Sequence, residues 1–267
     1  MIWILLMITV AGFAQKREKR SHQDFTKISF AVPGNAYVKQ GSAWSVELEA
    51  DAEVLDRVET KVENGKLLIR VKPTLKGRWT WNNGESVTAR ITLPVIEAIS
   101  VAGSGDLKGE GRFKTGNLEV KVAGSGSATL EVESADLDLS VAGSGDIRIK
   151  GRMKNIDTSV SGSGNIDLEA DSDGNFSGTI SGSGKINAKG KARSADLSIS
   201  GSGEVHAYGL TVAKCSARIS GSGDVEVTAT DDIDATISGS GSVTYKGDPK
   251  HVNSHSSGSG KVKRAEN

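Results

Sequence analysis

Apolar and polar residues alternate along most of the chain after residue 100. In the segment 137–141, leucine, leucine and valine alternate with aspartate and serine, and the segment 195–199 repeats this order with alanine, leucine and isoleucine. A period of two is that of a β-strand with one buried face. The pattern predicts an all-β chain made of many short strands.

A Gly-Ser-Gly tripeptide interrupts this alternation nine times, at intervals of 18 to 21 residues. Valine or isoleucine, followed by alanine or serine, precedes eight of the nine copies. Glycine suits a sharp corner because it adopts positive φ angles and lets backbones approach closely, and the serine between could bond its counterparts in neighbouring copies. The predicted corner residues include Gly103, Ser104, Gly105, Gly124, Gly126, Gly143, Gly145, Gly162, Gly164, Gly182, Gly184, Gly201, Gly203, Gly221, Gly223, Gly239 and Gly241.

These repeats predict a single-domain parallel β-helix, or solenoid, with right-handed coiling. One strand pair cannot bury its apolar face alone, whereas stacked pairs share a continuous core. Parallel crossovers are nearly always right-handed. An antiparallel meander, with each Gly-Ser-Gly as a hairpin turn, is the alternative. It would require tight turns of similar form at 170–174 and 189–193, but these segments differ in composition.

The repeats are predicted to occupy residues 100–264, and the segments before them are interpreted separately. Residues 25–99 lack the corner but alternate at Ile28, Phe30 and Val32 and carry a hairpin pattern around Asn64 and Gly65, which predicts a β-rich N-terminal cap. Residues 15–24 are interpreted as a charged linker. In the ninth copy, Ser254 and Ser256 take inward positions, as expected for a polar end cap.

Residues 1–14 are apolar, uncharged and end in small residues, which is typical of a signal peptide. The run is shorter than the roughly 20 residues that span a bilayer, so cleavage after Ala14 would leave no membrane span. An uncleaved anchor is the alternative, because no lysine or arginine precedes the apolar run. The segment predicts export to the periplasm, the outer membrane or the cell surface of a Gram-negative bacterium.

Charge and composition exclude some function classes. Lysine plus arginine equals aspartate plus glutamate at 33 each, so no net field attracts nucleic acid. No motif indicates a cofactor. The single cysteine, Cys215, falls at an inward position, where we expect a buried, inert thiol. The repeated corner serines do not form a nucleophile elbow, which needs one serine with a histidine partner.

Two features carry candidate binding chemistry, and a third residue, His206, is weighed beside them. Glu119, Asp138 and Asp157 take equivalent outward positions in successive copies, as a solvated acidic row or a weak site for a divalent cation. Trp79 and Trp81 would share one face of an extended segment, where they could stack on sugar rings or belong to the core of the cap. His206 occupies an outward slot and is interpreted as solvated surface.

The segment 100–107 and the Ile-Ser-Gly-Ser-Gly copies resemble the auto-transporter adhesin head GIN domain family of Bacteroidetes-type bacteria. The likeness covers about residues 25 to 265. It implies an extracytoplasmic β-helical protein.

We therefore expect a non-enzymatic exported envelope or cell-surface protein, with a rigid scaffold that binds a glycan or a surface protein. The alternative is a polysaccharide lyase or hydrolase, because parallel β-helices often carry such enzymes. That alternative requires one repeat with a unique charged cluster, such as two carboxylates about 5 to 10 Å apart.

Overall fold

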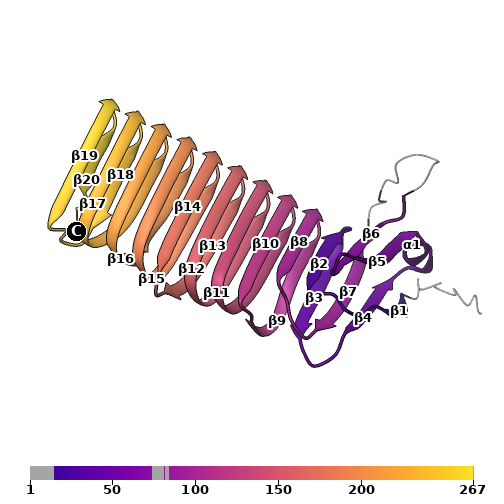
Figure 1. Cartoon of the computed structure of the whole chain (residues 1–267). Coiled ribbons are helices and arrows are strands. Elements are labelled where there is room, and N and C mark those ends of the chain that lie inside the picture. The colour runs from indigo at the N-terminus through magenta and orange to yellow at the C-terminus, as the bar shows by residue number, and fades with distance from the viewer. Residues whose placement is uncertain (1–14, 74–80, 82–83, 267) are drawn as a thin grey trace, which may run out of the picture.

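The fold is a β-solenoid of about nine turns with a single short helix among the described residues. The structure is a computed structural model that describes residues 15–73, 81 and 84–266, so the predicted signal segment lies outside it. Successive turns, here called rungs, stack along one axis, with the N-terminal elements at one end and the C-terminus at the other (Figure 1). The predicted all-β solenoid is confirmed.

The strands fall into an N-terminal group and a repeat group. The N-terminal group is β1 (Lys16–Arg20), β2 (Lys27–Ala31), β3 (Gly34–Gln40), β4 (Ser45–Ala50), helix α1 (Ala52–Arg57), β5 (Val58–Glu63), β6 (Lys66–Val71) and β7 (Val87–Leu93). The repeat group is β8 (Ala98–Gly103), β9 (Asp106–Lys114), β10 (Asn117–Gly124), β11 (Ser127–Gly143), β12 (Asp146–Gly162), β13 (Asn165–Ser172), β14 (Asn175–Gly182), β15 (Lys185–Gly201), β16 (Glu204–Gly221), β17 (Asp224–Gly239), β18 (Ser242–Lys246), β19 (His251–Gly258) and β20 (Lys261–Arg264).

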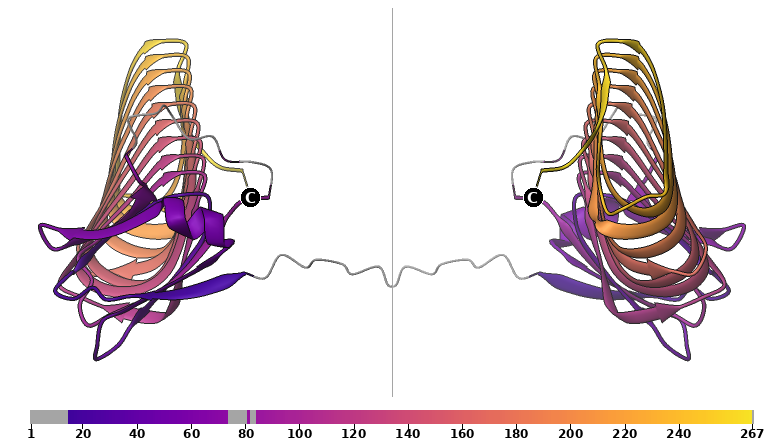
Figure 2. Two further views of the ribbon diagram at one scale, coloured as in Figure 1. Left: turned by 90° about the vertical axis from the view of Figure 1, so that its right-hand side faces the viewer. Right: turned by 90° about the vertical axis from the view of Figure 1, so that its left-hand side faces the viewer.

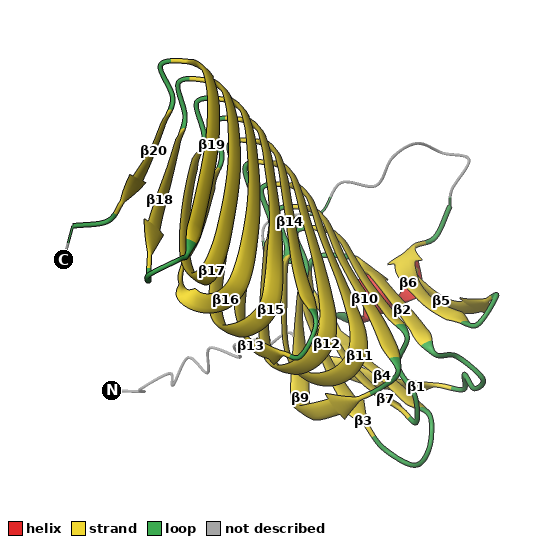
Figure 3. Cartoon of the chain, turned by 60° about the vertical axis from the view of Figure 1, so that its left-hand side comes forward, coloured by secondary structure: helices red, strands yellow, loops and turns green. Residues whose placement is uncertain are grey.

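Neighbouring rungs pair in parallel and in register. Between β11 and β12, Val141 lies opposite Val160 and Gly143 opposite Gly162. Equivalent repeat positions therefore form columns along the axis, and the antiparallel meander is wrong for the repeats. Strands such as β11 and β12 run without a break around the bend opposite the corner (Figure 3).

The Gly-Ser-Gly corner closes each rung against the one before it. Gly162 has φ of 122°, and a Cβ atom there would lie 2.5 Å from the carbonyl oxygen of Gly143. The backbone N–H of Ser163 donates to that same oxygen at 2.9 Å. The serine thus links the rungs at the corner through its main chain, and glycine is required because the rungs approach so closely.

Each rung is a flattened loop with two broad faces (Figure 2). We call the strand segments that run into the corner the leading face, as in β8, β10 and residues 136–143 of β11. The segments that leave the corner form the trailing face, as in β9, residues 127–133 of β11 and β13.

The interior is filled by columns of aliphatic side chains with a few large rings. One column contains the buried residues Leu137, Ile156, Phe176, Ala195, Cys215 and Ile233. Burial raises the pKa of the Cys215 thiol to about 12, so almost no reactive thiolate forms at neutral pH. This fits the inert thiol that the sequence predicts.

The N-terminal strands extend both faces. Strand β2 pairs in parallel with β6 and β8, and β3 pairs in parallel with β7 and β9. Antiparallel strands then finish each face at its N-terminal end. On the leading face β5 pairs with β6, and on the trailing face β4 pairs with β7 and β1 pairs with β4. The hairpin predicted around Asn64 and Gly65 is present, with φ of 50° and 71° at these residues.

Residues 15–24, interpreted from the sequence as a charged linker, contain strand β1. Its residues pair with β4 along five positions, and the Nε atom of Arg17 lies 3.0 Å from a carboxylate oxygen of Glu49. Opposite charges across the pair thus offset the low strand propensity of a charged segment.

The opposite end finishes in polar strands. Every residue of β19 is exposed, including Ser254 and Ser256, and Val252 is 39% exposed. Among the described residues, no helix has the length and apolar character needed to cross a bilayer.

Candidate ligand-binding groove on the trailing face

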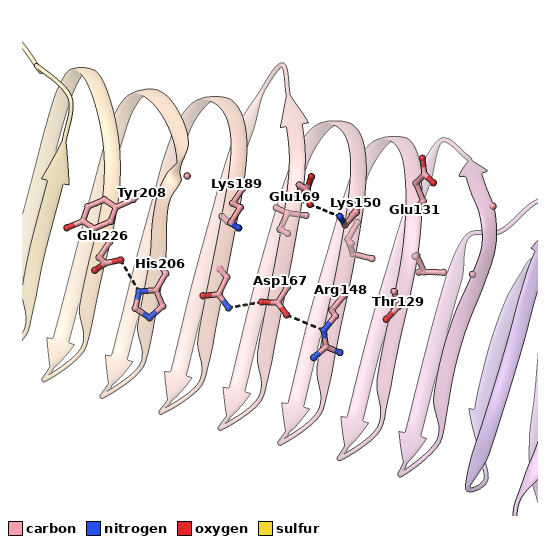
Figure 4. A pocket seen from close by; sticks show the side chains of 18 residues that line it. Thr129, Glu131, Arg148, Lys150, Asp167, Glu169, Lys189, His206, Tyr208 and Glu226 are labelled. Carbon is pink, nitrogen blue, oxygen red and sulfur yellow. Dashed lines mark hydrogen bonds and ion pairs between the residues drawn. The ribbon is translucent and has the colours of Figure 1, made fainter. Parts of the chain in front are cut away.

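A groove of about 730 Å³ runs along the solenoid axis on the trailing face, across the rungs from β9 to β17 (Figure 4). Its walls are outward side chains from these strands, and its floor includes the backbone between them. A single ligand that lies in such a groove could contact several rungs at once.

Backbone bulges lie at both ends of the groove. In β9, Lys108 pairs with Thr129 and Arg112 with Glu131, so Gly109, Glu110 and Gly111 all oppose one residue of β11. Two extra residues therefore protrude at this end.

At the other end the bulge is in β16. Asn187 pairs with His206 and Lys189 with Gly209, so that Ala207 and Tyr208 oppose the single residue Ala188. A Cβ atom on Gly209 would lie 2.7 Å from the Cγ atom of Lys189, so glycine allows this bulge to sit against the neighbouring rung. Five rung steps separate β9 from β16, a length of about 24 Å at the usual strand spacing.

Two rows of side chains line the groove between the bulges. One row, in register from rung to rung, is Thr129, Arg148, Asp167, Asn187, His206 and Glu226. The second row is Glu131, Lys150, Glu169 and Lys189. Both rows place unlike groups next to one another along the axis.

Several neighbours in these rows are bonded to each other. The carboxylate of Asp167 accepts from Asn187 at 2.7 Å and lies 3.3 Å from the Nε atom of Arg148. The ammonium of Lys150 lies 2.8 Å from Glu169, and this ion pair holds the pKa of the Glu169 carboxyl below its usual value. Cross-strand pairs of opposite charge add modestly to the stability of a sheet and favour the bonded positions of the side chains that take part.

The charges of the lining nearly cancel. The charged side chains are Glu131, Arg148, Lys150, Asp167, Glu169, Lys189, Glu226 and, when protonated, His206. Four are carboxylates and three are permanent cations, so a protonated His206 makes the groove neutral. Such a lining has no strong preference for an anionic or a cationic ligand.

His206 joins two rungs at the C-terminal end of the groove. Its Nδ1 atom lies 2.9 Å from Glu226 and its Nε2 atom 2.9 Å from Glu204. The hydrogen bond with Glu226, helped by Glu204, raises the pKa of His206 above 6.5 although partial burial acts against it. Both ring nitrogens can donate only in the imidazolium form, so protonation fits this geometry.

We expect His206 to titrate above pH 6.5 in an NMR titration of the folded protein, and Glu226→Gln to lower its pKa. The bonds of the imidazolium contribute stability in full below pH 6.5, and this contribution is lost as the pH rises through the raised pKa. His206→Gln assigns the resonance. A titration midpoint at or below 6.5 in the native protein would contradict the proposed arrangement.

The sequence profile of the family described as "Putative auto-transporter adhesin, head GIN domain" matches residues 24–172 and 164–249. The chain belongs to this family. The resemblance seen in the repeated corner is therefore confirmed, and no curated protein matches the chain.

Solved structures that are similar to this chain include two from Parabacteroides. A "putative lipid binding protein" of Parabacteroides distasonis ATCC 8503 is 25% identical, has a TM-score of 0.72 and aligns over 94% of this chain and 97% of that one. A "putative adhesin" of Parabacteroides merdae ATCC 43184 is 23% identical, with a TM-score of 0.72 over 94% of this chain and 96% of that one. The shared fold thus includes the N-terminal strands as well as the repeats.

The other candidate residues lie apart from the groove of this GIN domain. Glu119, Asp138 and Asp157 stack in register on the leading face. Partial burial, and then the charges of Asp157 and Glu119, raise the pKa of the Asp138 carboxyl. Among the described residues, no group of three histidine, cysteine or acidic side chains is arranged to hold a metal ion. The cation site stays a prediction.

The structure describes only one of the two tryptophans. Trp81 is partly buried and packs against the hydrophobic core, whereas Trp79 lies outside the described residues. Sugar stacking by this pair stays a prediction.

Sequence reasoning missed the groove and the role of His206, which is on the outer surface but bonded to two carboxylates. A signal was present in the repeat intervals. The first interval, from Gly103 to Gly124, is 21 residues instead of the common 19, and the two extra residues are those of the β9 bulge. The interval from Gly201 to Gly221 is 20 and contains the β16 bulge.

Proposed function

We propose that this GIN domain is a non-enzymatic, extracytoplasmic binding protein of the adhesin type, and that the groove on its trailing face holds the ligand. Membership of the family supports a surface-binding role. The observation that carries the proposal is the groove itself, which crosses the rungs between two bulges and has several lining side chains that bond to each other. Rigid, preorganised side chains lose little conformational entropy when a ligand binds.

The chemistry of the lining favours a neutral glycan. Carboxylate, amide, guanidinium and hydroxyl groups follow one another along the groove, so hydrogen-bond donors and acceptors alternate at the spacing of the rungs. The near-cancelling charges favour a ligand without net charge. An extended chain of sugars, with hydroxyl groups along its length, meets both requirements.

Two carboxylates of the groove region are unsuited to act as the acid of a glycoside hydrolase. A hydrolase needs one carboxyl whose pKa is raised so that it can donate a proton. Glu169 beside Lys150, and Glu204 bonded to Lys185 and His206, instead have carboxyl pKa values below the usual range. Their geometry supports binding rather than proton transfer.

The test places a bulky side chain in the groove. We expect Thr129→Trp to weaken binding of neutral hexasaccharides, with cellohexaose and chitohexaose as probes, by more than about tenfold, because the indole would fill space that the ligand needs. Thr129 is an exposed strand residue of the groove row, so the substitution leaves the core unchanged. Isothermal titration calorimetry measures the affinity.

Thr179→Trp is the matched control, since Thr179 is also an exposed threonine on a strand but lies on the leading face. We expect this variant to bind both probes like the unmodified protein. Equal loss in the two variants, or no binding of either hexasaccharide to the unmodified protein, would count against a glycan groove.

A further inference from the structure

Among the described residues that line the groove, Tyr208 is the one phenylalanine, tyrosine or tryptophan, and so supplies the one six-membered aromatic ring. It belongs to the β16 bulge, which interrupts the regular pairing with both neighbouring rungs. Bulges re-aim side chains that regular strands would present otherwise, and they concentrate near functional sites. The irregular backbone thus places an aromatic side chain at the C-terminal end of the groove.

A cation lies over one face of the Tyr208 ring. Tyr208 lines both the groove and a smaller hollow of about 380 Å³, whose lining also includes Thr244, Lys246 and Lys263. The ammonium of Lys246, which lines the hollow but not the groove, lies 4.6 Å from the ring centroid. The backbone carbonyl of Tyr208 accepts a hydrogen bond from the hydroxyl of Thr228 at 2.9 Å. The cation covers one face of the ring, and the hydrogen bond holds the backbone of the bulge, while Tyr208 itself lines the groove.

Hydrogen-bonding groups lie near Tyr208. His206 precedes Tyr208 by two residues, and Glu226 lies opposite His206 on the next rung (Figure 4). Both Lys185 and His206 contact the Oε2 atom of Glu204, and His206 contacts the Oε2 atom of Glu226. The Oε1 atom of Glu226, which lines the groove, therefore keeps the capacity to accept from a ligand hydroxyl.

We propose that Tyr208 forms a sugar-stacking subsite at the C-terminal end of the groove, where its ring packs on a neutral pyranose ring whose hydroxyls donate to Glu226. This inference rests on the proposed function and names the subsite that selects the ligand. An aromatic face prefers a pyranose whose hydroxyls are equatorial, because such a ring offers a flat surface of C–H groups. The β-linked glucose and N-acetylglucosamine chains of the two probes have such rings.

The test compares three variants in calorimetric titrations with cellohexaose and chitohexaose. We expect Tyr208→Ala to weaken binding of the better probe about tenfold and Tyr208→Phe to stay within about twofold, because stacking needs the ring but not the hydroxyl. Tyr37→Ala is the matched control. Tyr37 is also on the trailing face under a cation, with Arg90 5.1 Å from its ring centroid, but it does not line the groove. We expect no change there.

An NMR titration adds a readout that loss of fold would not imitate. Protons of a stacked sugar should shift upfield in the unmodified protein and in Tyr208→Phe, through the ring current. Wild-type affinity in Tyr208→Ala, without upfield shifts in the unmodified protein, would overturn the subsite. If Thr129→Trp still blocks binding in that case, the groove stands and the subsite alone fails. If neither variant affects binding, both proposals fail.

Discussion

We expect Gly162→Ala to destabilise the solenoid by more than about 3 kcal/mol, because a positive φ and a backbone clash act together there. The φ of 122° disfavours any residue with a Cβ atom. The added methyl group would lie 2.5 Å from the carbonyl oxygen of Gly143 and 3.2 Å from its carbonyl carbon and nitrogen. No rotamer change relieves this contact, so the two rungs must move apart at the corner.

Gly103→Ala separates the two causes. Gly103 is the first glycine of the first corner and has φ of 84°, but a Cβ atom there would meet nothing within 4 Å. We expect this variant to cost only about 1 to 2 kcal/mol, the strain of a positive φ alone. Urea unfolding followed by circular dichroism measures both. Equal destabilisation of the two variants would show that the stacking of corners is not what requires glycine.

The same corner shows why the fold was predictable. Each copy must meet its neighbours at the same point, so the sequence repeats glycine where the backbone approaches closely and alternates apolar residues where the core lies. Departures from the common interval of 19 also correspond to features of the structure. The interval of 20 from Gly162 to Gly182 is accommodated at the bend between β13 and β14, where Asp173 and Gly174 lie outside both strands. The variable intervals thus mark the places where the ladder is irregular.

The N-terminal rungs were harder to recognise because their connections differ from the repeated corner. Val32 and Pro33 connect β2 to β3, and Gly34, the first residue of β3, has φ of 120° like the corner glycines. Residues 72–86 join β6 to β7, a much longer connection at the equivalent place. Parallel pairing without a repeated tripeptide has no local sequence signal, because it depends on residues far apart in the chain.

The groove could be predicted only in part. Outward positions followed from the alternation, but a sequence does not show which outward side chains bond to each other. His206 illustrates this point, since its partners lie two residues before it and twenty residues after it. Only the register of β16 against β17 brings Glu226 to the ring. The bulge that presents Tyr208 likewise arises from pairing between rungs.

We expect Phe176→Ala to cost about 3 to 5 kcal/mol, as for other large rings removed from a packed core. Phe176 is fully buried, with Ile156 on the rung before it and Ala195 on the rung after it. Gly178, which follows on the same face of β14, has no side chain to fill the space. Phe176→Leu, which keeps most of the volume, should cost less than about 1.5 kcal/mol.

The position of the ring along the column can also be tested. Ala195→Phe alone should destabilise by about 1 to 3 kcal/mol through overpacking against Phe176. Because nearest rungs share one continuous core, the double variant Phe176→Ala/Ala195→Phe should be more stable than the sum of the two single effects by at least about 1 kcal/mol. Urea unfolding measures the cycle. Additive effects would mean that each rung packs its own interior, and the aliphatic columns would then be a consequence of repetition rather than the interaction that holds neighbouring rungs together.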